Sequence, residues 1–192
     1  MEKKIIIGLI GEKGSGKGTF VDLLSKIINK NNIAHLKSSM ILGDSLDLWN
    51  IKKTRENLQK LAIVMDENFG KGTLTNAIYE RIKNDKKNIV IYDGIRWQTD
   101  VEMIRSFHKN ILIYITANPK VRYERLKERK EKIGEENLTF EQFMKEEKAY
   151  TEIFISRIGK TADFKIENNY SIEKFKDKVK EFSERYLKGV SL

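Results

Sequence analysis

Residues 11–19, with the sequence GEKGSGKGT, combine the residue types that proteins use to bind phosphate groups. Glycines leave room for successive backbone N–H groups to converge on phosphate oxygens. The start of a helix adds positive potential, and a lysine such as Lys17 can reach the outer phosphates of a nucleotide. The stretch follows the apolar run 5–10 and opens a segment of helical spacing, as this chemistry requires. It predicts a cradle for a nucleoside triphosphate, and the alternative is a glycine-rich turn without a ligand.

The whole stretch is expected to contact the nucleotide, through Gly11, Glu12, Lys13, Gly14, Ser15, Gly16, Lys17, Gly18 and Thr19. Gly18 stands where a hydroxyl residue usually follows the lysine, so Thr19 becomes a candidate ligand for Mg²⁺. Asp93 is the second candidate, because it ends the apolar run 89–93 and enzymes with such a loop place an acidic residue near the magnesium. The alternative is that Asp93 caps a turn with Gly94.

The residues after Asp93 favour phosphate transfer over hydrolysis. Hydrolytic ATPases of the AAA class commonly place a water-activating glutamate after this aspartate, and here Gly94 occupies the position. The sequence also lacks an N-K-x-D stretch of the kind that GTPases use to read guanine. Arg96 follows in the stretch DGIR, and its planar fork suits an acceptor phosphate. The alternative for Arg96 is a surface ion pair with Asp100.

Strand-like apolar runs alternate with segments of helical spacing along the chain. The expected strands are 5–10, 33–38, 89–93, 111–117 and 162–168. Helices are expected at 20–28, 58–69 (capped by Thr54), 74–82 and 172–186, and at the capping patterns Thr99 with Glu102, Asn118 with Pro119, and Thr139 with Gln142. Repeated strand–helix units predict an α/β three-layer sandwich, with a five-stranded parallel sheet and helices on both faces.

Three stretches resemble the P-loop nucleoside and nucleotide kinases. GSGKGT at 14–19 resembles the loop of adenylate kinases and related nucleoside monophosphate kinases. DGIRWQTDVEMIR at 93–105 resembles a segment of phage-type deoxynucleoside monophosphate kinases, with a spacing one residue shorter than the DGFPR of adenylate kinases. ADFKIENNYSIEKF at 162–175 is similar to the end of these kinases and of dephospho-CoA kinases. The resemblance implies one P-loop kinase domain over 1–192, with an acceptor-binding insert at about 38–75 and a short lid at about 120–150.

The same resemblance implies ATP and Mg²⁺ as cofactors and roles for two arginines. RLKERK at 125–130 looks like the start of the kinase lid, where the first arginine packs on adenine and the second touches phosphate. These roles carry over to Arg125 and Arg129, and an ordinary salt-bridged helix is the alternative. The expected catalytic residues are Lys17, Asp93, Arg96 and Arg129.

The acceptor side is less defined, with Ser39, Arg55 and Arg96 as its candidate ligands. Adenylate kinases have an arginine soon after the second strand, and dephospho-CoA kinases usually carry an aspartate near Ser38; this chain has neither. The favoured function is transfer of the γ-phosphate of ATP to a small phosphorylated acceptor, preferably a nucleoside or deoxynucleoside monophosphate. The alternatives are a dephospho-CoA kinase-like activity, and a nucleic-acid end kinase or nucleotide-dependent RNA-binding protein.

The composition excludes several other classes of site. The 192 residues include no cysteine and two histidines, which excludes disulfides and zinc–cysteine sites and argues against a histidine metal cluster. No apolar run approaches the roughly 20 residues of a membrane-spanning helix, so a cytoplasmic protein is expected. The net charge of +9 attracts polyanions, but the aromatic residues lie mostly on apolar faces, which disfavours a nucleic-acid groove. The sequence indicates no oligomeric state.

Overall fold

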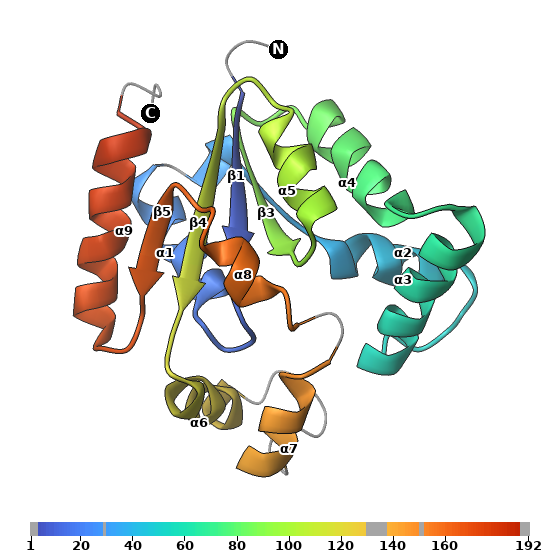
Figure 1. Cartoon of the computed structure of the whole chain (residues 1–192). Helices are drawn as coiled ribbons and strands as arrows, with labels where there is room; N and C mark the ends of the chain where they lie inside the picture. Colours follow the sequence, from blue (N-terminus) through green and yellow to red (C-terminus); the bar gives the residue numbers. More distant parts are fainter. Residues whose placement is uncertain (1–3, 29, 130–137, 150–151, 189–192) are drawn as a thin grey trace.

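The computed structural model describes residues 4–28, 30–129, 138–149 and 152–188, apart from the side chains of Lys30, Arg55 and Arg129. The chain forms a five-stranded parallel sheet with helices on both faces (Figure 1). The strands are β1 (Ile5–Ile10), β2 (Ile33–Lys37), β3 (Ile89–Ile95), β4 (Asn110–Thr116) and β5 (Phe164–Glu167), in the order β2-β3-β1-β4-β5. This confirms the expected α/β sandwich with five parallel strands.

The helices divide between the two faces of the sheet. One face packs against α1 (Lys17–Ile27) and α9 (Ile172–Tyr186). The other face is covered by α2 (Ser38–Leu48), α4 (Thr73–Asn84), α5 (Gln98–Arg105) and α8 (Ile155–Gly159). Three helices lie further out: α3 (Arg55–Phe69) packs on α2 and α4, and α6 (Pro119–Arg129) and α7 (Phe140–Glu146) lie beyond the carboxyl ends of the strands (Figure 1).

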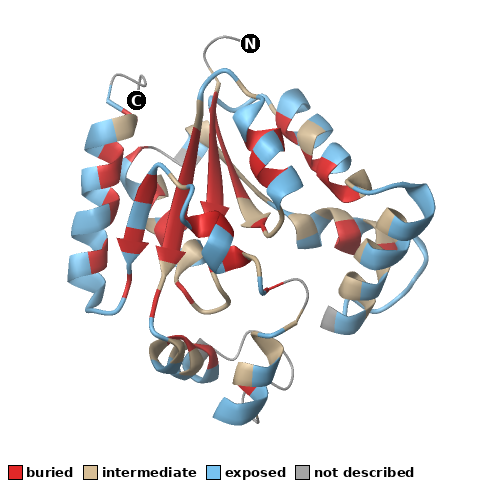
Figure 2. Ribbon diagram, viewed as in Figure 1, coloured by how far each residue is buried: buried red, intermediate tan, exposed pale blue. Residues whose placement is uncertain are grey.

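The central strand β1 is buried along its whole length (Figure 2). It pairs with β3 on one side and with β4 on the other. Its side chains alternate between the faces, so Ile7 and Leu9 pack towards α1 and α9 while Ile6 packs towards the opposite layer. A continuous apolar run suits a parallel strand that is covered on both faces. The loop that follows β1 is therefore anchored in the most buried part of the fold.

Three predicted caps are confirmed, and helices α2 and α8 are not predicted from the sequence. Oδ1 of Asn118 accepts the N–H of Lys120 at 3.1 Å, and α6 begins at Pro119 as expected. Thr54 accepts the N–H of Asn57 at 3.2 Å and caps α3. Thr139 and Gln142 form the expected capping box of α7. The sequence does not predict α2, because this helix contains Gly43 and its apolar residues form no marked stripe.

The capping box expected from Thr99 and Glu102 is wrong. Helix α5 begins at Gln98, one residue before the predicted cap. The carboxylate of Asp100, which is 2% exposed, accepts the backbone N–H groups of Arg96 at 2.9 Å and of Trp97 at 3.2 Å. A buried acid therefore fixes the turn between β3 and α5.

In the part of the chain that the structure describes, no helix is long and apolar enough to cross a membrane.

Candidate functional site

The loop at 11–16 connects the carboxyl end of β1 to the first turn of α1. A Cβ atom on Gly11 would lie 2.3 Å from the carbonyl oxygen of Ile115, and one on Gly16 would lie 2.5 Å from Nδ2 of Asn168. Gly16 also has a φ of 105°, which residues with side chains rarely adopt. Bare backbone therefore packs against its neighbours here. The loop opens onto the N-terminus of α1, where unpaired N–H groups and the helix dipole favour an anion.

Lys17, the first residue of α1, lies across this loop. Its Nζ donates to the carbonyl oxygens of Gly11 at 2.8 Å and Glu12 at 3.2 Å, and it lies 3.9 Å from Oδ1 of Asp93. Burial lowers the pKa of Lys17, Asp93 opposes this effect, and Arg96 adds to it. A phosphate over the loop would offer the ammonium group a charged acceptor, which binds more strongly than a neutral carbonyl.

Asp93 in β3 shares a face of the sheet with His35 in β2. The register pairs His35 with Ile91, so Asp93 is its diagonal neighbour, and Nε2 of His35 lies 3.6 Å from Oδ2 of Asp93. Burial raises the pKa of Asp93, but Lys17, His35 and Lys37 together bring it below its ordinary value. Asp93 therefore stays ionised. His35 is absent from the sequence-based prediction, and its only signal there is a place two residues before the end of β2.

Arg96, just after β3, forms an ion pair with a residue that the sequence analysis missed. Its Nη1 contacts Oε1 of Glu152, whose side chain is 5% exposed. Glu152 lies in the segment between α7 and α8, far from Arg96 in sequence, so no spacing rule could have joined the two. Asp100 is buried and accepts the backbone N–H of Arg96, so it is not the surface partner considered from the sequence.

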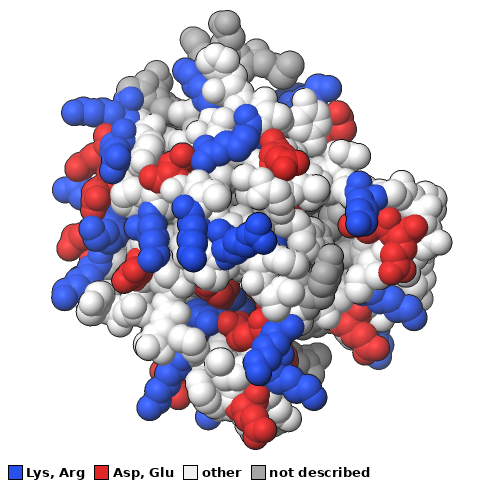
Figure 3. Space-filling view, viewed as in Figure 1, with Lys and Arg blue, Asp and Glu red and all other residues white. Residues whose placement is uncertain are grey.

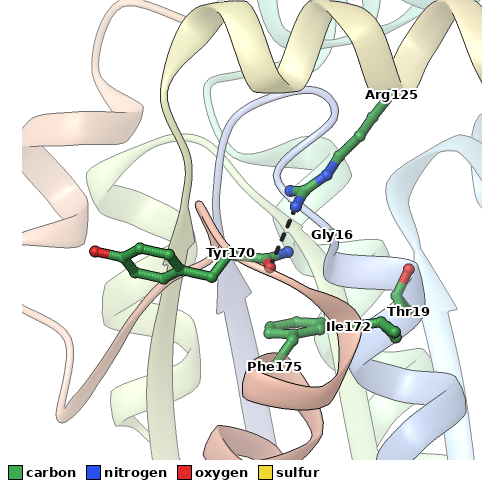
Figure 4. Close-up of a pocket in the computed structure, with 7 residues that line it drawn as sticks. Gly16, Thr19, Arg125, Tyr170, Ile172 and Phe175 are labelled. Atoms are coloured by element: carbon green, nitrogen blue, oxygen red, sulfur yellow. Dashed lines mark hydrogen bonds between the residues drawn. The ribbon is translucent and has the colours of Figure 1, made fainter.

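A cavity of about 230 Å³ opens beside the loop, lined by Gly16, Thr19, Arg125, Asn168, Tyr170, Ile172 and Phe175 (Figure 4). Arg125 reaches down from α6, and its Nη2 donates to Oδ1 of Asn168 at 3.4 Å. Nδ2 of Asn168 in turn donates to the carbonyl oxygen of Ser15 at 2.9 Å, which ties the cavity to the loop. Burial lowers the pKa of Arg125, and its Nη1 has no hydrogen-bond partner among the described residues. A planar cation with a spare donor beside apolar side chains can hold a planar base.

Arg122 joins α6, α7 and the loop. It is 4% exposed, and its guanidinium donates to the carbonyl oxygens of Ala117 at 3.0 Å and Lys13 at 3.2 Å. The same group lies 2.6 Å from the carboxylate of Glu147 and 5.4 Å from the ring centre of Phe143. Arg122 was not selected from the sequence, where it looks like any other residue of a charged helix.

The side chains of Glu12 and Lys13 reach neighbouring elements of the fold. Oε1 of Glu12 accepts a hydrogen bond from the hydroxyl of Tyr114 in β4 at 2.5 Å. Burial, with help from this contact, raises the pKa of Tyr114 to about 12. Nζ of Lys13 lies 3.0 Å from Oε2 of Glu146 in α7. These two residues can therefore bind a nucleotide through their backbone, while their side chains brace the loop.

The other predicted ligands are spread over the molecule. Thr19 lines the cavity with Arg125, whereas Asp93 lies beside Lys17. Lys17, which lies beside Asp93, and Thr19 are two residues apart on α1, and residues at this spacing do not face each other. The assignment of Thr19 and Asp93 as joint metal ligands stays a prediction. Ser39 is exposed in the first turn of α2, and its neighbour Ser38 is the serine that hydrogen-bonds inward, to the Tyr92 hydroxyl at 2.7 Å. The side chains of Arg55 and Arg129, and residues 130–137 of the expected lid, lie outside the described residues.

Among the described residues, no group of three histidine or acidic side chains converges to hold a metal ion. Mg²⁺ needs no such group, because it keeps several waters and binds through one or two carboxylates together with substrate phosphates. Asp93 supplies one ionised carboxylate beside the loop lysine. This donor set fits a magnesium ion that arrives with a nucleotide.

Comparison with known proteins gives a consistent result at the level of family and fold. A family model described as an AAA domain matches residues 7–148. A UPF0200 protein of Sulfurisphaera tokodaii is 32% identical over 182 residues, covering 95% of this chain and 97% of that protein. A UPF0200 protein of Pyrococcus horikoshii is 27% identical over 188 residues, covering 95% of this chain and 98% of that one.

Solved structures share the fold. A shikimate kinase from Bacteroides thetaiotaomicron superimposes with a TM-score of 0.65 at 13% sequence identity, covering 94% of this chain and 97% of that one. A shikimate kinase from Acinetobacter baumannii in complex with shikimate gives a TM-score of 0.56 at 15% identity, covering 97% and 94%. At these identities the likeness concerns the fold alone.

Proposed function

The chain belongs to the UPF0200 family and has the fold of P-loop kinases, and from this premise we propose that it transfers the γ-phosphate of ATP to a small phosphorylated acceptor. The favoured acceptor is a nucleoside or deoxynucleoside monophosphate. One observation carries the proposal: Lys17, Asp93 and Arg96 gather at the carboxyl end of the sheet, beside a cavity that shares the same loop.

The donor side of this site comprises the loop at 11–19 and the cavity around Arg125. The base of ATP would lie in the cavity against the guanidinium of Arg125, and the phosphates would follow the N–H groups of the loop to Lys17. Asp93 would hold Mg²⁺ from the sheet side, and the ion would neutralise charge on the β- and γ-phosphates. Arg129, which follows Arg125 by one helical turn, is proposed as a phosphate contact from the lid.

The acceptor side comprises Arg96, Glu152 and the helices α2 and α3. The proposed acceptor insert, about 38–75, holds both helices, and the proposed lid, about 120–150, includes α6 and α7. Ser39 and Arg55 stay candidate acceptor ligands on this side. On the face seen in Figure 3, acidic side chains lie between the basic ones over several elements, which favours a small acceptor over a continuous nucleic-acid track. A kinase of small metabolites would work in the cytoplasm.

In the transfer step, an oxygen of the acceptor attacks the γ-phosphorus in line. A bond forms to that oxygen, the bond between the γ-phosphorus and the β,γ-bridging oxygen breaks, and ADP leaves with its electron pair. An acceptor phosphate attacks as an anion and needs no base to remove a proton. Lys17 and the loop N–H groups lie where they can stabilise the charge that spreads over the transferring group.

The test is an acceptor screen with the full-length protein, MgATP and a panel of nucleoside and deoxynucleoside monophosphates, dephospho-CoA and 5′-hydroxyl RNA. ADP release is the readout, and mass spectrometry identifies the product. We expect one nucleoside monophosphate class to raise ADP release at least about tenfold over the rate without acceptor and to gain one phosphate. Equal slow release with every compound, with inorganic phosphate as the only product, would instead indicate a hydrolase.

A further inference from the structure

The Arg96–Glu152 ion pair lies beside the phosphate-binding lysine. Both partners act on Lys17: burial lowers its pKa, Arg96 lowers it further, and Glu152 works in the opposite direction. Arg96 follows Asp93 by three residues at the end of β3, and Asp93 lies 3.9 Å from Nζ of Lys17. The pair therefore occupies the region where the terminal phosphate of a nucleotide and its acceptor would meet.

Glu152 is the more deeply buried partner. Its side chain is 5% exposed, compared with 38% for Arg96, and its backbone N–H is fixed by the carbonyl oxygen of Ala149 at 2.8 Å. A carboxylate buried to this extent is costly unless a cation pairs with it. Glu152 places a buried carboxylate next to a loop suited to anions, and its ion pair with the guanidinium of Arg96 offsets the cost of burying that charge.

The charge of Glu152 conflicts with a bound nucleotide. A γ-phosphate near Lys17 would be attracted by Arg96 and repelled by the nearby carboxylate. An acceptor phosphate would compete for the guanidinium of Arg96, whose Nη1 now contacts Oε1 of Glu152. Only one of the two anions can hold the same N–H groups of the fork at a time.

Resting on the proposed function, we propose that Glu152 is an internal stand-in for the anionic group of the acceptor. The acceptor carries a phosphate or carboxylate group that replaces the Glu152 carboxylate on Arg96. While no acceptor is bound, Glu152 holds Arg96 away from the γ-phosphate and the site stays unproductive. Neutral acceptors lack a group that can displace Glu152, so they are poor substrates.

The opposing model makes Glu152 a permanent support that orients Arg96 for the acceptor. The two models predict opposite signs for Glu152→Gln, which removes the charge and keeps the shape. If Glu152 competes with the acceptor, its removal lowers the acceptor KM about five- to tenfold and raises ADP release without acceptor. If Glu152 only supports Arg96, its removal raises the acceptor KM or lowers kcat. The matched control is Glu181→Gln, a surface change in α9 that should leave both constants unchanged.

A binding experiment tests the stand-in without knowledge of the true acceptor. The full-length protein is first saturated with Mg²⁺ and a non-hydrolysable ATP analogue, so that the loop is filled, and inorganic phosphate is then titrated by calorimetry. We expect Glu152→Gln to bind this phosphate about five- to tenfold more tightly than the wild type. Adding Arg96→Ala to Glu152→Gln should abolish this increase in affinity. Equal or weaker binding by Glu152→Gln overturns the proposal.

The two layers of hypothesis fail in different ways. If no acceptor in the panel stimulates ADP release in either protein, the proposed function fails, and the phosphate titration still decides the role of Glu152. If Glu152→Gln does not fold, Glu152→Asp provides a second variant, because its shorter carboxylate withdraws from Arg96. A thermal melt checks the fold of each variant. Glu152→Asp should then shift phosphate binding in the same direction, and a shift towards weaker binding counts against the stand-in.

Discussion

The donor side and the acceptor side of the site differ in how they are built. On the donor side, one contiguous stretch supplies the loop, and Arg125 and Asn168 close the cavity next to it. On the acceptor side, Arg96 depends on Glu152 from a distant segment, and none of the described side chains of α3 is buried. Leu48 and Trp49, at the end of α2, are 84% and 58% exposed. In the proposed site, phosphate binding would therefore be encoded largely by one local stretch, while acceptor recognition would depend on distant segments meeting.

Removing Lys17 should have the largest effect, because in the proposed mechanism this residue stabilises the charge on the transferring group itself. Lys17→Ala should lower kcat for phosphotransfer by about 10³-fold. Its thermal midpoint should stay close to that of the wild type, since the ammonium group mainly contacts loop carbonyls. Lys26→Ala, an exposed change in the last turn of the same helix, is the control. Near-normal turnover of the Lys17 variant would refute the assigned role.

Arg122→Ala should disrupt the donor side by lowering the stability of the folded protein. The change leaves the carboxylate of Glu147 without its partner and frees the carbonyl of Lys13, so we expect a loss of about 3 kcal/mol in the free energy of unfolding. Chemical denaturation measures this loss. Arg105→Ala removes an exposed pair with Asp163 and should cost only about 0.5 kcal/mol. Similar losses in the two variants would show that Arg122 does not brace the loop.

Arg125→Ala should affect the donor side and leave the acceptor side unchanged. The guanidinium is proposed to contact the base of ATP and no part of the acceptor. We therefore expect the KM for ATP to rise about tenfold, with kcat and the acceptor KM changed less than about twofold. Steady-state kinetics with each substrate varied in turn makes this measurement. An increase in the acceptor KM alone would place Arg125 on the wrong side of the site.

Thr19→Val should have the smallest effect. It tests whether the Thr19 hydroxyl only lines the donor cavity or binds the metal ion. Thr19 lines the donor cavity and not the Asp93 region, so the Mg²⁺ concentration at half-maximal activity should change less than about twofold. A ligand of the ion would instead shift that concentration by about 10- to 100-fold. A large shift would support the sequence-based assignment of Thr19 as a metal ligand.

Particular residues show which features of the structure can be predicted from the sequence. The strands and most helices follow from apolar periodicity, and the caps at Thr54 and Thr139 follow from local hydrogen bonding. The cap of α5 could not be predicted, because Asp100 is held by burial and by Thr75, 25 residues earlier. His35 and Arg122 were missed for the same reason, since their partners lie on other elements.

The amino-acid sequence by itself determined the phosphate loop, because backbone N–H groups can converge only where glycines and a helix start occur together at 11–19. It also determined the layered α/β fold through the alternation of apolar patterns. Only the tertiary structure decided which side chains face the loop. His35 reaches Asp93 because parallel strands bring their carboxyl ends to one edge of the sheet. Glu152 reaches Arg96 from the segment between α7 and α8. Because these charges are partly buried where the fold brings them together, they interact more strongly than they would in water.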